Sequence, residues 1–172
     1  MKVEFKPVKT ETEIEDLAQT AGTIWREYWP ALIGEAQTEY MIEQFQSLGA
    51  IKRDMENAAY EYWFIEVTSD DGATRRVGYT GGHNEPETNR FFISKIYLYA
   101  SERGHGFASA TIRFYEKLCR ARGFHAAYLT VNKHNELGIR AYTGKGFKTI
   151  ESVETDIGGG FIMDDFIMQL EI

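Results

Sequence analysis

The residues with the clearest chemical potential form a short glycine-bearing loop between an apolar run and a helical pattern. The apolar run covers residues 92–99, and the sequence RGHG at 103–106 leads into a helix that begins near Phe107. The first amides of a helix lack internal acceptors, and the helix dipole places partial positive charge there. Glycines also let the backbone approach an oxygen-rich ligand closely. The spacing therefore predicts a binding site for a phosphate group.

A tight connection that binds no ligand would use the same glycines, and the loop alone leaves this alternative open. Two nucleotide-binding motifs fit the sequence poorly. The chain contains no Gly-Lys-Ser or Gly-Lys-Thr for a P-loop. The loop also lacks the complete GxGxxG spacing, with an acidic residue about 20 positions later, that is typical of dinucleotide-binding folds.

The elements that position this loop can be predicted from apolar periodicity and capping residues. The helix after the loop has two adjacent apolar rows and ends at Gly123. An apolar segment at 126–131 predicts a buried strand, which runs parallel to the strand before the loop because a helix connects the two. Asn135 predicts the start of another helix, residues 136–145, closed by Gly146.

The rest of the chain predicts further helices and a set of strands joined by short turns. Alternating residues predict a strand at 3–7, and Thr10 with Glu13 forms a capping box for a first helix. A second helix is expected over 40–48, ending near Gly49. The remaining strands, expected to pair as antiparallel hairpins, cover residues 60–67, 75–82, 91–99, 147–157 and 161–172.

Size and charge restrict the class of the protein and its partners. A length of 172 residues is compatible with one domain over 1–172 that has a single core. The formal net charge of −7 disfavours nucleic acid as a partner, since phosphate backbones need clustered Lys and Arg, and it favours neutral or cationic small substrates. The single cysteine, Cys119, excludes an internal disulfide. The charged N-terminal residues and the lack of a long apolar stretch lead us to expect a cytoplasmic protein with no membrane partner.

Other candidate residues have structural explanations as well as functional ones. Trp29, beside the helix-breaking Pro30, is a candidate for the wall of a substrate pocket, or it packs in the core. Glu35 begins an acidic ridge at every fourth residue, which could attract a cation or only face solvent. His83 follows two glycines and is expected in a surface loop. No second His or Cys lies at ligand spacing from it, so no metal site is expected.

Two motifs in register resemble those of the GNAT superfamily of acyl-CoA-dependent N-acetyltransferases, and the resemblance covers nearly the whole chain. The first motif, Arg or Gln, two residues, Gly, one residue, then Gly or Ala, is met by Arg103, Gly106 and Ala108. The second is an Asn followed by Ala, Tyr and Gly-Phe, and it is met by Asn135, Ala141, Tyr142, Gly146 and Phe147. The resemblance implies an α/β (α+β) fold with a mixed, mostly antiparallel central sheet, splayed between the fourth and fifth strands and flanked by helices.

The resemblance also implies acetyl-CoA as the co-substrate, with no metal. Tyr97 and Leu98 would bind its pantetheine arm through their main chain, where splayed strands leave amides to be satisfied. Asn135 would contact the cofactor too. The backbone amides that would bind its pyrophosphate are those of Arg103, Gly104, His105, Gly106, Phe107 and Ala108.

The chemistry implied is direct attack of a neutral primary amine on the thioester in a ternary complex, with an acid that protonates the departing thiolate. Tyr142 matches the family's general acid, since a phenol with a pKa of about 10 stays protonated at neutral pH, although a core aromatic is the alternative. Many members place a glutamate four residues before the position of Leu98, where this chain has Ser94. The base is therefore unassigned, and the candidates besides a water chain are Glu35, Asp164 and Asp165.

The acceptor is the least defined part of this expectation. The last hairpin resembles bacterial members related to polyamine acetyltransferases, and Asp156 and the acidic pair at 164–165 would suit a cationic small-molecule amine. Amino acids, aminoglycosides and protein N-termini stay open as acceptors. An acyl-enzyme route through Cys119 is less favoured because an apolar helix face suggests packing. The alternatives to this enzyme are a catalytically silent acyl-CoA sensor and an interaction module without cofactor, and a homodimer is expected on the resemblance alone.

Overall fold

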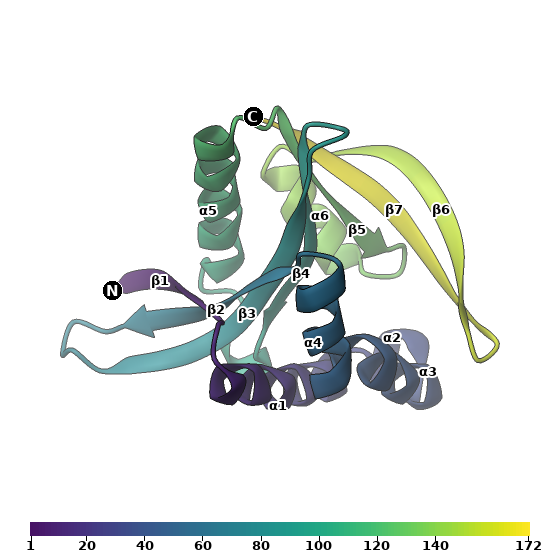
Figure 1. The fold of residues 1–172 in the computed structure, drawn as a ribbon, viewed down its shortest axis with the longest axis horizontal. Helices are drawn as coiled ribbons and strands as arrows, with labels where there is room; N and C mark the ends of the chain where they lie inside the picture. Colours follow the sequence, from purple (N-terminus) through teal and green to yellow (C-terminus); the bar gives the residue numbers. More distant parts are fainter. The chain divides into compact units, whose positions relative to one another are not determined.

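Seven strands of the computed structural model, which describes residues 1–172, are hydrogen-bonded in the order β1-β2-β3-β4-β5-β7-β6 (Figure 1). The sheet is mostly antiparallel, and β4 and β5 run parallel because a helix connects them. The predicted mixed sheet is therefore confirmed. The strands are β1 (Lys2–Pro7), β2 (Glu61–Thr68), β3 (Thr74–Glu85), β4 (Arg90–Leu98), β5 (Ala126–Asn132), β6 (Lys148–Gly158) and β7 (Phe161–Glu171).

The helices fall into two groups along the chain. The first group is α1 (Glu11–Tyr28), α2 (Pro30–Ile33), α3 (Glu35–Met41) and α4 (Leu48–Asn57), with a π-helical turn, η1 (Ile42–Gln46), before α4. The second is α5 (Phe107–Arg122) and α6 (Glu136–Gly144), with a 3-10 turn, η2 (Ala100–Glu102), before α5. The chain forms two compact units: the first unit is residues 1–83 with 95–111, and the second unit is residues 84–94 with 112–172.

Helix α1 of the first unit begins as its capping residues predict. Thr10 Oγ1 accepts a hydrogen bond from Glu13 N (3.2 Å), and Glu13 Oε2 accepts one from Lys9 N (2.9 Å). The apolar stripe of α1 packs on β2, β3 and α4 in a core that includes Leu17, Ala21, Ile24, Ile51, Tyr62, Phe64 and Tyr79. This packing holds the C-terminal end of α1 against the sheet.

The predicted second helix over 40–48 is wrong in its bounds. The segment is divided between α3, η1 and α4, and Gly49 lies in the first turn of α4 instead of at a helix end. Ser47 accounts for the difference, because its side chain accepts a hydrogen bond from Ala50 N (3.2 Å) and caps a new helix. The helix that follows was not anticipated.

The predicted surface loop at His83 is also wrong. His83 lies within β3, half-buried, with its ring centre 5.0 Å from that of Tyr60. The two preceding glycines belong to the strand and do not form a turn. A Cβ on Gly81 would lie 2.6 Å from Tyr62 Cδ1, so a close side-chain contact requires this glycine.

Gly78 of β3 lets the end of β4 approach closely. A Cβ at this position would collide with the carbonyl oxygen of Tyr97 and lie 3.0 Å from Leu98 Cα. We expect Gly78→Ala to lower the free energy of unfolding by about 1–3 kcal/mol through overpacking, as measured by chemical denaturation. Gly49→Ala is the control, because a Cβ there meets no atom within 4 Å and alanine favours a helix. Equal stability of Gly78→Ala and the wild type would contradict the close approach.

In the second unit, the parallel pairing of β4 with β5 is short, with Arg90–Phe92 opposite Ala126–Tyr128. A sheet that is splayed between β4 and β5 can keep only a short pairing between these two strands, and the observed pairing agrees with this. The other edge of β5 pairs with β7 along its whole length, so that Asn132 lies opposite Asp165. The predicted C-terminal hairpin is confirmed, because β6 and β7 pair antiparallel around glycines with positive φ (Figure 1).

Candidate active site

The loop before α5 has a backbone that requires its glycines. Gly104 and Gly106 have φ values of +78° and +84°, and a Cβ on either would meet no atom within 4 Å. The left-handed backbone, and not a lack of space, therefore selects glycine. Ala110 N donates to Gly106 O (3.1 Å) and begins the intrahelical ladder, so the amides at 107–109 precede it. An anion is stabilised at such a helix start.

Arg103 fastens this loop within the first unit. Its guanidinium donates to Leu98 O (3.2 Å) and lies 4.5 Å from the centre of the Tyr28 ring. Its amide donates to Ala100 O (3.4 Å), so the amides that can still bind an anion begin at Gly104. Burial raises the pKa of the Tyr28 phenol, and the nearby Arg103 charge partly opposes this shift. Arg103 is thus a fixed cation at the start of the loop.

Phe107 anchors the start of α5 in the core of the first unit. Its side chain is 2% exposed and packs with Ile65, Val67 and Val77, and Leu98 packs against the same cluster. His105 is exposed, with its ring centre 6.1 Å from that of Phe107, and Ala108 is half-buried. The packing of Phe107 and Leu98 therefore holds both ends of the loop.

An aromatic cluster of Trp25, Tyr28, Trp29, Tyr79 and Tyr97 lies at the end of α1. The Trp29 and Tyr97 ring centres are 6.3 Å apart. Trp25 Nε1 donates to Tyr79 OH (3.0 Å), whereas Trp29 Nε1 is buried and has no hydrogen-bond partner. A buried N–H without an acceptor costs about 1–3 kcal/mol. Trp29 therefore packs in the core and also presents a donor that a ligand oxygen could satisfy.

Lys95 is a chemically unusual residue that the sequence did not single out. Its side chain is buried, and its Nζ donates to Tyr62 OH (2.7 Å) and lies 5.1 Å from the centre of the Tyr60 ring. Burial lowers the pKa of the Lys95 ammonium to about 8, while Asp54 acts in the opposite direction. The sequence did contain a signal for the burial of Lys95, because it falls in the same every-second-residue pattern as the inward-facing apolar residues of its strand. The tyrosine contacts satisfy this cation within the core.

Helix α6 carries the second motif in the second unit. Asn135 caps it as predicted, because Asn135 Oδ1 accepts a hydrogen bond from Gly138 N (2.9 Å). Tyr142 is half-buried, with its ring centre 5.7 Å from that of Phe147, and Phe147 N donates to Tyr142 O (3.1 Å). Gly146 has a φ of +98° and ends the helix. The Gly-Phe pair of the motif thus supports the ring of Tyr142.

The three candidate bases have different surroundings. Glu35 is exposed at the start of α3, and Asp164 Oδ1 forms an ion pair with Lys133 Nζ (2.5 Å). Asp165 is 6% exposed, and burial together with the neighbouring Asp164 raises its pKa to about 6, with Lys133 opposing the shift. Asp165 is therefore the only one of the three carboxylates that is buried.

The acidic ridge and Cys119, two further features considered in the sequence, have structural explanations. The acidic ridge is not one helix face, because Glu39 is bonded to Arg26 (2.8 and 3.1 Å) and Glu43 lies in η1. Cys119 is fully buried, and burial raises the pKa of its thiol to about 11. A thiolate is therefore scarce at neutral pH, and Cys119 is a packing residue.

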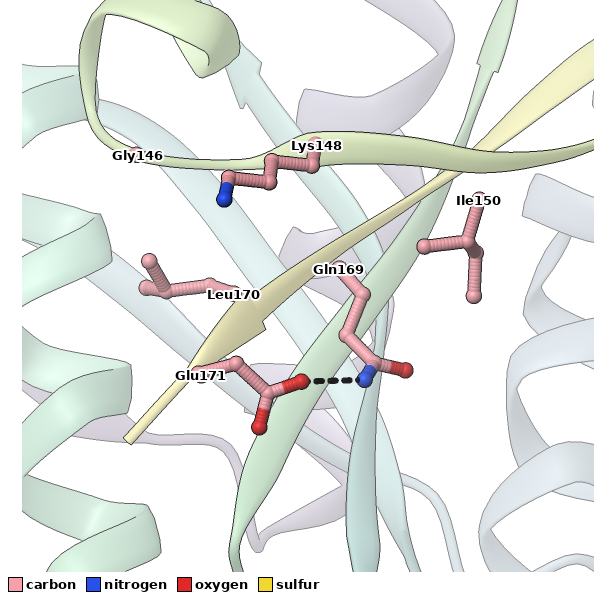
Figure 2. A pocket seen from close by; sticks show the side chains of 6 residues that line it. All are labelled: Gly146, Lys148, Ile150, Gln169, Leu170 and Glu171. Carbon is pink, nitrogen blue, oxygen red and sulfur yellow. Dashed lines mark hydrogen bonds between the residues drawn. The ribbon is translucent and has the colours of Figure 1, made fainter.

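An open pocket on the second unit lies outside the predicted site. Figure 2 shows it at the start of β6 and the end of β7, where Gln169 Nε2 donates to Glu171 Oε1 (2.7 Å). Its lining residues are Gly146, Lys148, Ile150, Gln169, Leu170 and Glu171. None of the candidate catalytic, cofactor or substrate residues lines it, so this pocket does not define the active site.

Neither a membrane-spanning helix nor a metal-binding cluster is present in the structure. None of its helices combines the length and the apolar character needed to cross a bilayer. No three or more His, Cys, Asp or Glu side chains gather in an arrangement suited to a metal ion.

Comparisons with known proteins agree with both motifs. The model of the acetyltransferase (GNAT) family matches residues 21–147. The PaiA N-acetyltransferase from Thermoplasma acidophilum, solved in complex with coenzyme A, superimposes with a TM-score of 0.76 at 19% identity, covering 100% of both chains. A GCN5-related N-acetyltransferase from Rhodopseudomonas palustris has a TM-score of 0.76 at 13% identity, covering 100% of this chain and 97% of its own. A variant of the SpeG spermidine N-acetyltransferase from Vibrio cholerae has a TM-score of 0.66 at 12% identity, covering 98% and 93%.

A search of curated proteins found no significant sequence match. The low identities to the solved structures establish a shared fold, whereas the family model matches most of the chain, including the loop before α5 and the end of α6. The chain belongs to the acetyltransferase (GNAT) family, and it is an acyltransferase enzyme of the class that its two motifs predicted.

Proposed function

We propose that this protein is an acetyl-CoA-dependent N-acetyltransferase that transfers the acetyl group directly to a primary amine of a small molecule. The observation that carries the proposal is the loop before α5, with two left-handed glycines and the first amides of the helix beyond Arg103. This arrangement suits a pyrophosphate, which the donor would provide. The match to the family model over the same residues supports this assignment.

The residues of the first unit fit acetyl-CoA on geometric grounds. The amides from Gly104 to Ala108 can bind its phosphates, and the open space at the glycine Cα atoms lets it approach. The main chain of Tyr97 and Leu98 is assigned to the pantetheine arm, and Asn135 of the second unit to a further contact. When bound, acetyl-CoA supplies an activated thioester.

One proton transfer of the reaction, to the departing thiolate, is assigned to a residue of this chain. The Tyr142 phenol is assigned as the acid that protonates the departing thiolate, as its place in the motif suggests. A route through an acyl-cysteine is disfavoured because the Cys119 thiol is buried and its pKa is raised to about 11. A neutral amine attacks the thioester carbonyl directly, the carbon–sulfur bond breaks, and the thiolate leaves with the proton from Tyr142. The nitrogen loses its own proton to water, and no covalent enzyme intermediate forms.

A polyamine is the acceptor class to test first. Fold neighbours include a spermidine N-acetyltransferase, and the formal net charge of −7 attracts cations. The test combines the protein with acetyl-CoA and spermidine, spermine, diamines, amino acids, aminoglycosides and peptides with free N-termini, followed by mass spectrometry of each amine. We expect acetylated polyamines. If every amine stays unmodified while acetyl-CoA still binds, the protein is an acyl-CoA sensor instead.

Trp29 gives a prediction about ligand binding. Trp29→Phe keeps the ring in the aromatic cluster but removes the buried Nε1–H that lacks a partner. If an oxygen of acetyl-CoA accepts that hydrogen, the affinity for acetyl-CoA should fall about 3- to 10-fold, while protein stability is unchanged or higher. Calorimetry and thermal unfolding measure the two effects.

The matched control is Trp25→Phe. Its Nε1 already donates to Tyr79 OH (3.0 Å), so its loss should lower stability and leave ligand affinity nearly unchanged. Equal ligand affinities of Trp29→Phe and the wild type would remove Trp29 from the substrate site.

A further inference from the structure

Asp165 is a buried carboxylate whose charge no protein group neutralises directly. It lies on β7, opposite Asn132 of β5 and Val153 of β6, and only 6% of its surface is exposed. No hydrogen bond to its side chain is among the causes that set its pKa, which are burial and the charges of Asp164 and Lys133. Isolated buried carboxylates are costly, so a chain seldom keeps one without a role.

The charged groups around Asp165 leave it without a counter-ion. Lys133, which follows β5, forms its ion pair with Asp164 (2.5 Å), and the Lys133 backbone N donates to Asp164 O (3.0 Å). On β6 the residue directly opposite is Val153, and the neighbouring Glu154 lies opposite Asp164 and adds negative charge. The local cation is thus already committed to the adjacent carboxylate.

The strand register places a second polar group on the same face. Residues directly opposite in an antiparallel pair point to the same side of a sheet, so Asn132 and Asp165 share a face. Asn132 Oδ1 accepts a hydrogen bond from His134 N (2.8 Å), which fixes the orientation of the amide. This face lies at the C-terminal end of β5, beyond the residues that pair with β4.

We infer that the Asp165 carboxylate binds a positively charged ammonium group of the acceptor, distinct from the neutral amine that is acetylated, and so makes the enzyme selective for amines that carry a second, cationic nitrogen. The inference rests on the proposed acetyl transfer to a small amine. An alkylammonium offers N–H donors and the positive charge that this carboxylate lacks, in a region where water is largely excluded. A divalent metal is a poorer match, since such ions need several oxygen ligands and no group of three or more acidic or His side chains is present.

The experiment is calorimetry of spermidine binding to the wild-type protein, Asp165→Asn and Glu154→Gln, each saturated with coenzyme A. Both variants remove one negative charge from this part of the hairpin and keep the side-chain shape, and both leave Lys133 paired with Asp164. We expect Asp165→Asn to weaken spermidine binding about 10- to 100-fold, and Glu154→Gln by less than about 3-fold. Asp165→Glu should restore part of the affinity, and coenzyme A binding should be equal in all four proteins.

Thermal unfolding separates a binding role from a structural one. Removing an uncompensated buried charge should raise the unfolding temperature of Asp165→Asn, whereas a structural carboxylate would leave the variant less stable. Because the folded pKa of Asp165 lies above its ordinary value of 3.8, the stability gain of the variant should grow as pH rises from about 4 to about 6 and stay constant at higher pH.

The outcomes distinguish this inference from the proposed function. Equal spermidine affinity of Asp165→Asn and the wild type would overturn the role of Asp165, whether or not the wild type acetylates amines. A loss confined to Asp165→Asn would support it even if the wild type released no thiol, since binding is measured without turnover. If both variants lost spermidine affinity to the same degree, the net charge of the protein alone would explain the binding. That result would also overturn the role of Asp165.

Discussion

Replacing Tyr142 with phenylalanine should lower turnover with acetyl-CoA and its amine about 10- to 1,000-fold, the usual loss when an acid catalyst is removed. The ring contact with Phe147, whose centre is 5.7 Å from that of Tyr142, does not involve the hydroxyl, so the fold should be preserved. Acetyl-CoA affinity should change little, because the phenol acts on the departing thiolate. Steady-state kinetics and calorimetry on the same preparation measure both quantities.

Tyr128→Phe is the matched control for this result. Tyr128 lies in the same unit, and its hydroxyl donates to the Glu85 carboxylate, outside the proposed machinery. Its loss should reduce stability and leave turnover within about 3-fold of the wild type. If Tyr142→Phe turned over as fast as the wild type, Tyr142 would be only a packing residue of α6.

Replacing Gly106 with tryptophan should abolish acetyl-CoA binding. The residue has a φ of +84° and precedes the free amides of α5, so an indole there would cover the phosphate site. We expect no calorimetric heat at acetyl-CoA concentrations that saturate the wild type, and no thiol release with any amine.

Gly72→Trp separates loss of the site from backbone strain. Gly72 lies in the turn between β2 and β3 with a φ of +86°, and a Cβ there also meets no atom within 4 Å. The two variants therefore carry the same conformational cost and the same added surface. Acetyl-CoA binding by Gly106→Trp at the level of Gly72→Trp would exclude the loop as the phosphate site.

The sequence was sufficient to predict elements that local signals define. The Thr10 cap, the helix that begins at Phe107 and the Asn135 cap all appear where periodicity and capping chemistry placed them. The C-terminal hairpin was equally predictable from its run of three glycines. These features depend on residues close together in the chain, so a single sequence contains the information.

Other elements depend on contacts that local patterns do not reveal. Gly49 was read as a helix end, although the Ser47 cap makes it part of α4. The glycines before His83 predicted a surface loop beyond the strand, although the Tyr62 ring on the adjacent strand requires Gly81 and β3 continues past His83. In both cases a glycine could either end an element or lie inside it, and contacts with other parts of the fold determined which of the two occurs.

In the candidate site, too, some features follow from local sequence and others depend on tertiary contacts. The loop at 103–106 and the α6 motif could be read from residue types and spacing. The buried donor of Trp29, the buried ammonium of Lys95 and the buried carboxylate of Asp165 could not, because the burial of these groups arises only when distant elements pack together. Asp165 was one of three equal candidates in sequence, and its burial sets it apart from Glu35 and Asp164.

The most direct test of the proposed function is the rate of free-thiol release from acetyl-CoA, with and without spermidine, at a protein concentration well below that of the substrates. We predict multiple turnovers, with a rate that depends on the amine, saturates as the amine concentration rises and is lower in Tyr142→Phe. Acetyl-CoA that binds but releases no thiol with spermidine or any other amine of the panel would contradict an acetyltransferase activity toward small amines.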